Sequence, residues 1–392
     1  MGRRRRAADT NTVIAGLLRD LAAVQSSRQR RWGFARAADA IAALPAPIES
    51  FVQPDGTLRK IANIGPSSTR VILEVLLTGQ SPTVDRAIAE SGKTVDIEKS
   101  RRFRGTFLSR AEVLAALGNR RLRALSLDDY RGDLQMHSTY SDGRQTLAVI
   151  METGISRGYD YAAVTDHSYG LPIAHGVSMA RLARQHREID QLNARYAGRF
   201  RLLKGIEANI LADGTVDMTP EERRGLDLVV AAPHSALRSS ADQTERLLAA
   251  VRTPGVHILG HPRGRKYGVR PGVTANWDRI FEAAARAGVA VEIDGDPRRQ
   301  DLDHHLARRA LAAGCLFALD SDAHSPEEWD FAEIAVAHAR LARIPRERVI
   351  NCWPLDDLLT WARHRGEPTS RLLHSARSAD AGSMRVMRRA GR

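Results

Sequence analysis

The stretch Gly132-Asp133-Leu134-Gln135-Met136-His137-Ser138-Thr139-Tyr140-Ser141-Asp142-Gly143 decides how the rest of the chain is interpreted. A short apolar run leads into it, and a Ser-Asp-Gly turn signal ends it, as at the end of a β-strand. Between them lie one imidazole, one carboxylate and the carboxamide of Gln135, which stands where a second imidazole is expected. Alone this pattern is weak, because His and Asp near a turn usually belong to the polar surface.

Later segments repeat the pattern of a short β-forming run that ends in His, Asp or Glu. They are 159–167 with His167, 201–207 with Glu207, 226–234 with His234, 256–262 with His261, 289–294 with Glu292 and Asp294, and 316–324 with Asp322 and His324. Helix-like stretches such as 177–196 and 301–313 separate most of them. Strands that alternate with helices predict parallel strands joined by crossovers. If these strands close into a barrel, the metal-competent side chains share the mouth at its C-terminal end.

Composition bounds the class of protein. The chain has 392 residues, 43% of them apolar, which is enough for two or three globular cores. The net charge of +13 and the pI of about 10.4 favour an acidic partner, nucleic acid first. The alternative explanation of this charge is that the chain comes from a proteome that is generally rich in arginine. Cys315 and Cys352 imply no disulfide framework and fit a reducing cytoplasm. No apolar run approaches the ~20 residues of a membrane span, so no membrane association is expected.

Residues 10–92 are predicted to form a small all-α domain. The apolar spacing within 11–25 is typical of an amphipathic helix. A second helix is expected over 34–44, where Pro45 and Pro47 end it.

The stretch 58–72 resembles a helix-hairpin-helix, with a short helix, a tight Asn-Ile-Gly turn and Pro66 opening the next helix. Such a turn directs backbone N–H groups and a helix N-terminus at a phosphate. Asn63, Gly65 and Ser67 are therefore the candidate phosphate-binding residues of this domain. Asn63 occupies the usual place of the first hairpin glycine, and asparagine tolerates left-handed geometry. The alternative is an ordinary corner between two helices.

Residues 93–131 are interpreted as a basic linker, with a short helix at 111–117. The run Arg101-Arg102-Phe103-Arg104-Gly105 is either a nucleic-acid contact or a solvated linker. Residues 367–392 are rich in Arg, Ser and Gly, lack apolar periodicity, and are predicted to be a disordered basic tail.

The strand-end residues suggest a metal centre. Imidazole together with carboxylate suits Zn²⁺, Mn²⁺ or Fe²⁺ better than Mg²⁺ or Ca²⁺. A carboxylate such as Glu207 can bridge two ions. Ion pairs of this kind clamp the attacking and leaving oxygens in phosphoester hydrolysis and supply hydroxide at neutral pH. The sequence contains no nucleophile elbow, Walker loop or dinucleotide fingerprint.

From about 130 to 365 the chain resembles a PHP domain, the polymerase-and-histidinol-phosphatase family of metallohydrolases. The resemblance rests on Gly-Asp-Leu-Gln-Met-His-Ser-Thr-Tyr-Ser-Asp-Gly, Val-Thr-Asp-His-Ser, Lys-Gly-Ile-Glu, Gly-His-Pro and Ser-Asp-Ala-His-Ser-Pro, in the family's order. It is greatest to the PHP domain that ends bacterial family X DNA polymerases, whose first domain the helical region also resembles. Residues 93–131 are too few to hold a polymerase palm. The chain is therefore expected not to be a DNA polymerase.

The resemblance implies a distorted, seven-stranded (β/α)7 TIM-like barrel over 132–366 with a trinuclear metal centre. The metal ligands implied are His137, Glu207 and Asp322 for the first ion, Asp142, His167 and His324 for the second, and Glu207, His234 and His261 for the third. His137, Asp142, Glu207, Asp322 and His324 are the implied catalytic residues. Gln135 departs from the family's histidine, and because a carboxamide is a poorer ligand, two to three ions of Mn²⁺ or Zn²⁺, with Fe²⁺ possible, are expected.

Basic residues follow the Gly-His-Pro motif. Arg263, Arg265, Lys266 and Arg270 are candidates to hold a phosphate, and the alternative is a basic surface loop. Glu292 is either a partner of a metal ligand or the polar end of its strand.

Together these features predict a metal-dependent phosphoesterase acting on nucleic acid, as a 3′-5′ exonuclease or in DNA-end processing during repair. One alternative is a phosphomonoesterase of histidinol-phosphatase type acting on a small metabolite. The other is a DNA-binding scaffold with a degenerate metal site, which Gln135 favours. A monomer is expected.

Overall fold

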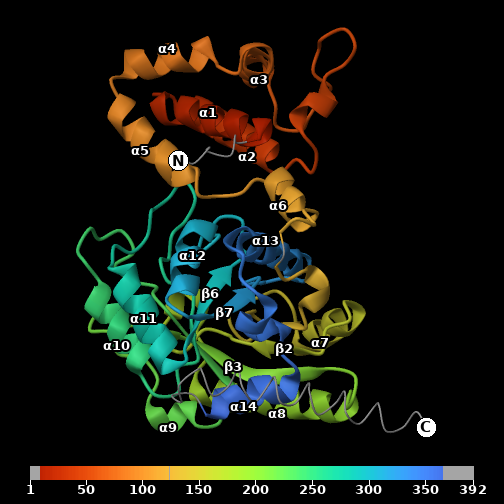
Figure 1. Cartoon of the computed structure of the whole chain (residues 1–392), viewed down its shortest axis with the longest axis vertical. Helices are drawn as coiled ribbons and strands as arrows, with labels where there is room; N and C mark the ends of the chain where they lie inside the picture. Colours follow the sequence, from red (N-terminus) through yellow and green to blue (C-terminus); the bar gives the residue numbers. More distant parts are fainter. Residues whose placement is uncertain (1–8, 123, 365–392) are drawn as a thin grey trace. The chain divides into compact units, whose positions relative to one another are not determined.

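The computed structural model describes residues 9–122 and 124–364 of the chain. Its contacts divide the chain into two compact units, Met1–Asn119 and Arg120–Arg392 (Figure 1). Each unit has a hydrophobic core of its own, so each is described by itself. The expected tail at 367–392 lies outside the described residues.

The first unit is helical, as expected. Its elements are α1 (Thr10–Val24), α2 (Arg28–Ala42), the 3₁₀ helix η1 (Ile48–Phe51), α3 (Pro66–Thr78), α4 (Pro82–Ser91), α5 (Thr94–Arg104) and α6 (Arg110–Leu117). The side chain of Ser27 caps α2, so that helix begins well before the expected start at residue 34. Ile14, Leu18, Ile41 and Ile72 are fully buried in one core. Burial of these apolar faces holds the helices together.

The predicted hairpin is present only in part. Asn63 has a φ of 66°, and α3 opens on Pro66 after the cap residue Gly65, as expected for the turn and the second helix. The short first helix is not formed. Leu58 instead pairs with Val52 in an antiparallel bridge, and the N–H of Arg59 donates to the carbonyl of Phe51. These bonds commit the backbone that a helix would need.

Residues 93–119 differ from the expected linker. Helices α5 and α6 lie here, and Ile97 of α5 is buried in the core of the first unit. The buried carboxylate of Asp20 on α1 accepts hydrogen bonds from Arg101, at 2.6 Å, and from Arg104. The basic run therefore fixes α5 against α1, and Arg101 and Arg104 are engaged in ion pairs.

The second unit confirms the predicted barrel. Its strands are β1 (Gly132–Asp133), β2 (Tyr161–Val164), β3 (Arg201–Asn209), β4 (Leu228–Ala232), β5 (Ile258–Leu259), β6 (Ala290–Asp294) and β7 (Leu316–Asp320). They form one seven-stranded sheet in sequence order, and each pair of neighbours is parallel. A parallel bridge between Met136 and Ala323 joins the ends of the first and last strands and closes the barrel. All strand C-terminal ends therefore share one mouth.

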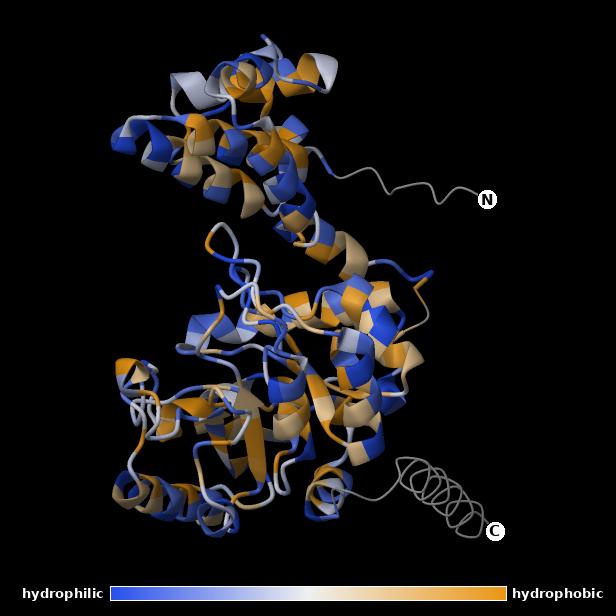
Figure 2. Cartoon of the chain, turned by 90° about the vertical axis from the view of Figure 1, so that its left-hand side faces the viewer, coloured by the Kyte–Doolittle hydropathy of each residue, from blue (hydrophilic) through white to orange (hydrophobic). Residues whose placement is uncertain are grey.

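Helices surround these strands (Figure 1). They are η2 (Leu127–Asp129), α7 (Leu147–Ser156), η3 (Pro172–Ala174), α8 (Met179–Arg195), α9 (Pro220–Arg223), α10 (Thr244–Arg252), α11 (Trp277–Ala287), α12 (His304–Ala312), η4 (Pro326–Phe331), α13 (Ala332–Ala342), η5 (Arg346–Arg348), η6 (Ile350–Cys352) and α14 (Leu355–Arg363). Strands are hydrophobic while the helices alternate in hydropathy, as Figure 2 shows, which is the pattern of a barrel buried under amphipathic helices. None of the helices described is long and apolar enough to cross a bilayer.

One end of the barrel is filled with apolar side chains. Leu358 and Trp361 of α14 pack in a cluster with Leu228, Ile258 and Leu316, which lie at the beginnings of their strands. This plug occupies the N-terminal end of the barrel. The polar residues that follow the strands are therefore confined to the opposite end.

Candidate metal centre

Strand ends distant in sequence bring the expected ligands together. His137 follows β1, His167 follows β2, Glu207 lies in β3, His234 follows β4, His261 follows β5, and Asp322 and His324 follow β7. Asp142 lies in the loop after β1. Three groups among the described residues have ligand atoms close enough to share an ion: His137, Asp142, His167 and His324; His167, Glu207 and His234; and His137, Glu207 and Asp322.

Glu207 is the buried centre of the cluster. Its Oε1 lies 2.8 Å from Nε2 of His261 and 3.0 Å from Nε2 of His234. Its Oε2 lies 3.1 Å from Nδ1 of His167 and 3.3 Å from Nε2 of His137. Burial favours the neutral acid, but His167 and His234 hold the pKa of Glu207 well below its usual range. A carboxylate that directs each oxygen at a different pair of imidazoles has the geometry to bridge two ions.

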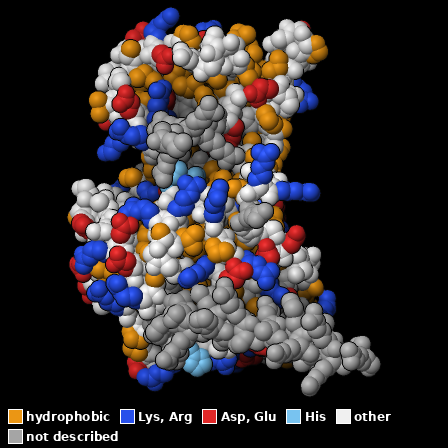
Figure 3. All heavy atoms as spheres, in the orientation of Figure 1, with side chains coloured by type: hydrophobic (Ala, Val, Ile, Leu, Met, Phe, Trp, Pro, Cys, Tyr) orange, Lys and Arg blue, Asp and Glu red, His pale blue; other side chains and the backbone are white. Residues whose placement is uncertain are grey.

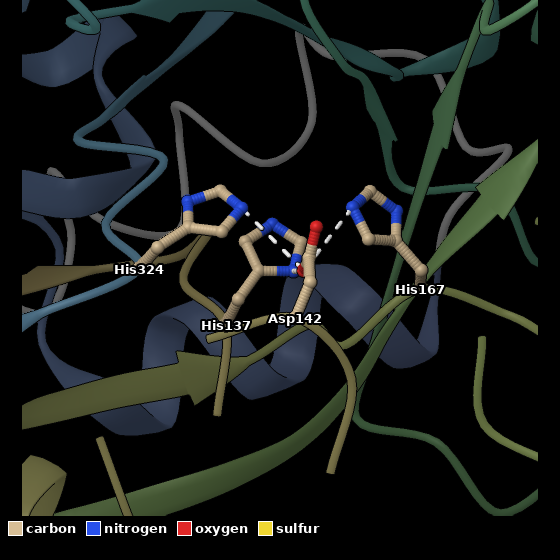
Figure 4. A group of neighbouring side chains, drawn as sticks. All are labelled: His137, Asp142, His167 and His324. Carbon is tan, nitrogen blue, oxygen red and sulfur yellow. Dashed lines mark ion pairs between the residues drawn. The ribbon is translucent and has the colours of Figure 1, made fainter. Parts of the chain in front are cut away.

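Asp142 lies among three imidazoles (Figure 4). Its Oδ1 is 3.5 Å from Nε2 of His324, 3.7 Å from Nε2 of His167 and 3.9 Å from Nδ1 of His137. Burial opposes ionisation of Asp142, yet its hydrogen bond with His324 and the neighbouring imidazoles lower its pKa to about 2. Burial likewise opposes protonation of His324, but Asp142 and Asp322 raise its pKa to about 9. Burial lowers the pKa of His167 to about 3, against the attraction of Glu207. These separations leave room for an ion between the four side chains.

Asp322 connects the cluster to an arginine. Its Oδ1 lies 3.0 Å from Nε2 of His137, and its Oδ2 lies 3.2 Å from a guanidinium nitrogen of Arg299. Arg299 also lies 3.6 Å from Asp294. The guanidinium of Arg299 offsets the negative charge of Asp322 and helps to lower its pKa. Arg299 was not identified from the sequence, where its position after the β6 segment was the only indication of a role.

Gln135 is fully buried at the position expected for histidine. Neither its amide oxygen nor its amide nitrogen has a hydrogen-bond partner among the described residues, and the same is true of Nδ1 of His261. Unpaired buried polar atoms are costly, so a native site that contains them fits a bound cation that satisfies some of them. The donor set of imidazole and carboxylate fits a divalent transition metal.

Other residues orient the ligands. The Oδ1 atom of Asn209 lies 2.6 Å from Nδ1 of His234. The backbone N–H of His261 donates to the carboxylate of Glu292, which therefore acts as a partner of a ligand and is not merely a strand end. A partner on the ring nitrogen, as Asn209 is for His234, fixes the ring orientation and tautomer of a candidate ligand, whereas Glu292 holds the backbone of His261. Asn209 was not identified from the sequence, although it lies two residues after Glu207 and so points to the same face of β3.

The basic loop after His261 differs from the expectation in one residue. Arg265 is fully buried, and its guanidinium donates to the carbonyls of Arg299 and Gln300. It also forms an ion pair with Asp303 at 3.3 Å. The prediction that Arg265 holds a phosphate is therefore wrong, because its donors are committed inside the protein.

The remaining cations of this loop differ in whether they form an ion pair and in how exposed they are. Arg263 pairs with Asp303 at 3.0 Å. Lys266 and Arg270 are partly exposed. Burial and the charges of Arg298 and Arg299 lower the pKa of Lys266, so these cations share one region. The N–H of Tyr267 donates to the carbonyl of Arg298 at 2.6 Å, which joins the two loops.

The candidate phosphate-binding residues Asn63, Gly65 and Ser67 belong to the first unit and are exposed. The side-chain oxygen of Asn63 accepts a hydrogen bond from Arg36. These three residues are separate from the candidate metal ligands, which all belong to the second unit.

Comparison with known proteins finds relatives named as phosphatases and as an exonuclease. No protein-family model matches the chain. It is 32% identical over 251 residues to a probable phosphatase of Citrobacter koseri, covering 60% of this chain and 96% of that protein. The probable phosphatase YcdX of Escherichia coli K12 is 28% identical over 249 residues, with the same coverage.

A larger relative is the DNA polymerase/3′-5′ exonuclease PolX of Bacillus subtilis, 36% identical over 238 residues. The match covers 60% of this chain but only 42% of that protein, so the chain spans less than half of its length. The solved structure of histidinol phosphate phosphatase from Lactococcus lactis, with zinc, L-histidinol and phosphate, gives a TM-score of 0.44 at 18% identity, over 54% of this chain and 92% of that one. At that distance the likeness carries no weight on function.

Proposed function

The chain belongs to the PHP family of metal-dependent phosphoesterases, and from that premise we propose that it hydrolyses nucleic acid, as a 3′-5′ exonuclease or in DNA-end processing. The observation that carries the proposal is the position of Glu207. One buried carboxylate contacts four imidazoles from four different strand ends, an arrangement suited to a centre with more than one ion.

The proposed ligands are His137, Asp142, His167, Glu207, His234, His261, Asp322 and His324. When bound there, divalent ions such as Zn²⁺ or Mn²⁺ would lower the pKa of water and stabilise negative charge on phosphoryl oxygens. The protein's own residues then hold the site in shape. Asn209 orients His234, Glu292 fixes the backbone of His261, and Arg299 balances the charge of Asp322.

Charge supports a nucleic-acid substrate. The chain carries a net charge of +13, and Lys and Arg side chains are spread over the face shown in Figure 3. Lys266 and Arg270 are partly exposed and share the loop region of Arg299, which itself contacts the metal-ligand candidate Asp322. Cations placed there can hold a phosphate of the substrate. The exonuclease named among the relatives is consistent with this substrate class.

The second candidate is a phosphomonoesterase for a small metabolite. It is favoured by the relatives named as probable phosphatases, which the chain covers over 96% of their length. The two candidate functions use the same metal centre. They differ in the molecule that carries the phosphate, which is a nucleic acid in the first and a small metabolite in the second.

The decisive experiment compares substrates on one preparation. The purified chain is loaded with Mn²⁺ or Zn²⁺ and given end-labelled single-stranded DNA, end-labelled duplex DNA and p-nitrophenyl phosphate. We expect release of nucleotides from DNA 3′ ends, lost on chelation and reduced at least ~100-fold in His324→Ala, since a lost ligand costs no less than a lost ligand partner. Hydrolysis of the monoester alone would select the second candidate. No hydrolysis of any substrate would support a DNA-binding scaffold.

A further inference from the structure

Trp32 on α2 is the most exposed aromatic residue in the part of the chain that the structure describes. Its relative exposure is 62%, whereas Trp329 and Trp361 are buried in the second unit. Residues Arg28 to Gly33 are all exposed, so the first turns of α2 contact solvent on every side. The residues of α2 that enter the core are Ala37, Ala38 and Ile41, near its other end. Trp32 therefore contributes little to the packing of the first unit.

Trp32 lies within a line of arginines. Arg28 and Arg36 are four residues before and after it, and residues at this spacing share one face of a helix. The guanidinium carbon of Arg36 lies 4.5 Å from the centre of the Trp32 ring. We call the face formed by Arg28, Trp32 and Arg36 the tryptophan stripe. Its two arginines are about 12 Å apart along the axis, at ~1.5 Å per residue.

The tryptophan stripe runs into the hairpin turn. Arg36 donates a hydrogen bond to the side-chain oxygen of Asn63, directly before the exposed start of α3. The stripe and the turn therefore form one continuous surface on the first unit.

The charge of this surface is not neutralised. Arg28 and Arg30 have no side-chain partner among the described residues. Asp39 is the single acidic residue of α2, and it pairs with Arg19 of α1. An exposed indole between guanidinium groups that no carboxylate among the described residues neutralises matches a ligand that has flat rings and regularly spaced negative charges.

We propose that the tryptophan stripe binds an unpaired stretch of nucleic acid, with Trp32 stacked on a base and the arginines on the flanking phosphates. This rests on the proposed function and deepens it, because it selects single-stranded DNA or a frayed end over intact duplex. Charge complementarity selects nucleic acid over a protein partner, since a basic face with one aromatic offers little apolar area for a protein interface.

The test is a binding measurement in EDTA, so that it does not depend on hydrolysis. Fluorescence anisotropy of a labelled oligo(dT) strand and of a blunt duplex is measured over a salt series for the full chain and for four variants, Trp32→Ala, Trp32→Phe, Arg28→Ala and Leu77→Ala. Leu77 is the control, because it is 84% exposed on α3 of the same unit and outside the stripe. Circular dichroism melts confirm that each variant is folded.

We expect Trp32→Ala to weaken oligo(dT) binding by about 10-fold or more, in line with the loss of one stacked base. Trp32→Phe, which keeps a ring, recovers most of the affinity, and Leu77→Ala has no effect. The slope of log affinity against log salt stays the same in Trp32→Ala but falls by about 0.7 in Arg28→Ala, since only the arginine releases a counterion. Equal affinity of wild type and folded Trp32→Ala, or equal losses for strand and duplex, would overturn the proposal. DNA binding without hydrolysis would overturn the proposed function alone.

Discussion

The side-chain amide of Gln135 is buried in the barrel, and no described residue forms a hydrogen bond with its oxygen or its nitrogen. Because a neutral carboxamide is a weaker ligand than imidazole, the site shared with His137, Glu207 and Asp322 is expected to bind its ion less tightly. Gln135→His should therefore raise metal content from about two ions per chain toward three and raise the rate of hydrolysis several-fold. Plasma mass spectrometry of the purified protein and initial rates on one substrate are the measurements.

Three fully occupied ions in the wild type would contradict this expectation. A higher metal content in the variant without a higher rate would show that this metal site does not contribute to hydrolysis.

Asp133 gives a prediction about pH. Burial, and then the nearby charge of Asp320, raise the pKa of Asp133 to about 8. The folded protein therefore holds a proton that the unfolded chain releases near its ordinary pKa of 3.8. Because the folded state binds this proton and the unfolded state does not, the folded state loses stability as the pH rises. The contribution of Asp133 to the free energy of unfolding therefore falls between about pH 5 and pH 8.

Asp133→Asn removes that contribution while keeping the shape of the side chain. We expect the Tm of the variant, relative to wild type, to rise by several degrees between pH 5 and pH 8 in EDTA. About 1 kcal/mol corresponds to roughly 2–4 °C in a domain of this size. Parallel Tm-versus-pH curves for the two proteins would show that Asp133 does not retain its proton.

At the scale of single residues, the sequence predicted which strand-end side chains gather at the mouth better than it predicted their partners. His137, His234 and Asp322 were expected there because each comes at or soon after the end of a β-forming run, and barrel closure brings such positions together. Arg265 was misassigned because a run of basic residues says nothing of which side chain is buried. Arg299 was missed because its role depends on a loop path that sequence periodicity does not encode.

Among the elements, α5 shows how a basic segment can be structural. The carboxylate of Asp20 is buried on α1 and accepts from Arg101 and Arg104 of α5. Asp20→Ala should destabilise the first unit by about 2–3 kcal/mol, because it leaves the poorly exposed Arg104 without its counter-charge. Asp39→Ala is the matched control: it also breaks an ion pair with α1, but Asp39 is 66% exposed, and exposed pairs contribute about 0–1 kcal/mol.

Urea unfolding monitored by circular dichroism measures both variants. Equal midpoints for Asp20→Ala and Asp39→Ala would mean that burial does not strengthen the first pair.

Element boundaries were harder to predict than element types. The helical class of the first unit and the parallel barrel of the second follow from the period of the apolar residues. The start of α2 was placed too late because its first turns are exposed and carry no apolar pattern. The first helix of the hairpin was expected from a motif, but the Val52–Leu58 bridge takes its backbone hydrogen bonds.

For the whole molecule, we expect the division into two units to separate nucleic-acid binding from hydrolysis. The proposed metal ligands, from His137 to His324, all lie in the second unit, whose apolar plug and barrel closure also come from its own residues. A chain that lacks residues 1–119 should therefore keep its metal content and its rate on a small phosphodiester within about two-fold. Its affinity for single-stranded DNA should fall at least ~10-fold, because the tryptophan stripe and the hairpin turn are removed. The salt dependence of binding should also become shallower, because fewer arginines release counterions from the strand. Metal analysis, hydrolysis of thymidine 5′-p-nitrophenyl phosphate and anisotropy titrations over a salt series measure these properties. If the truncated chain binds DNA as tightly as the full chain, the basic loop around Lys266 and Arg270 carries the nucleic-acid contact and the first unit does not.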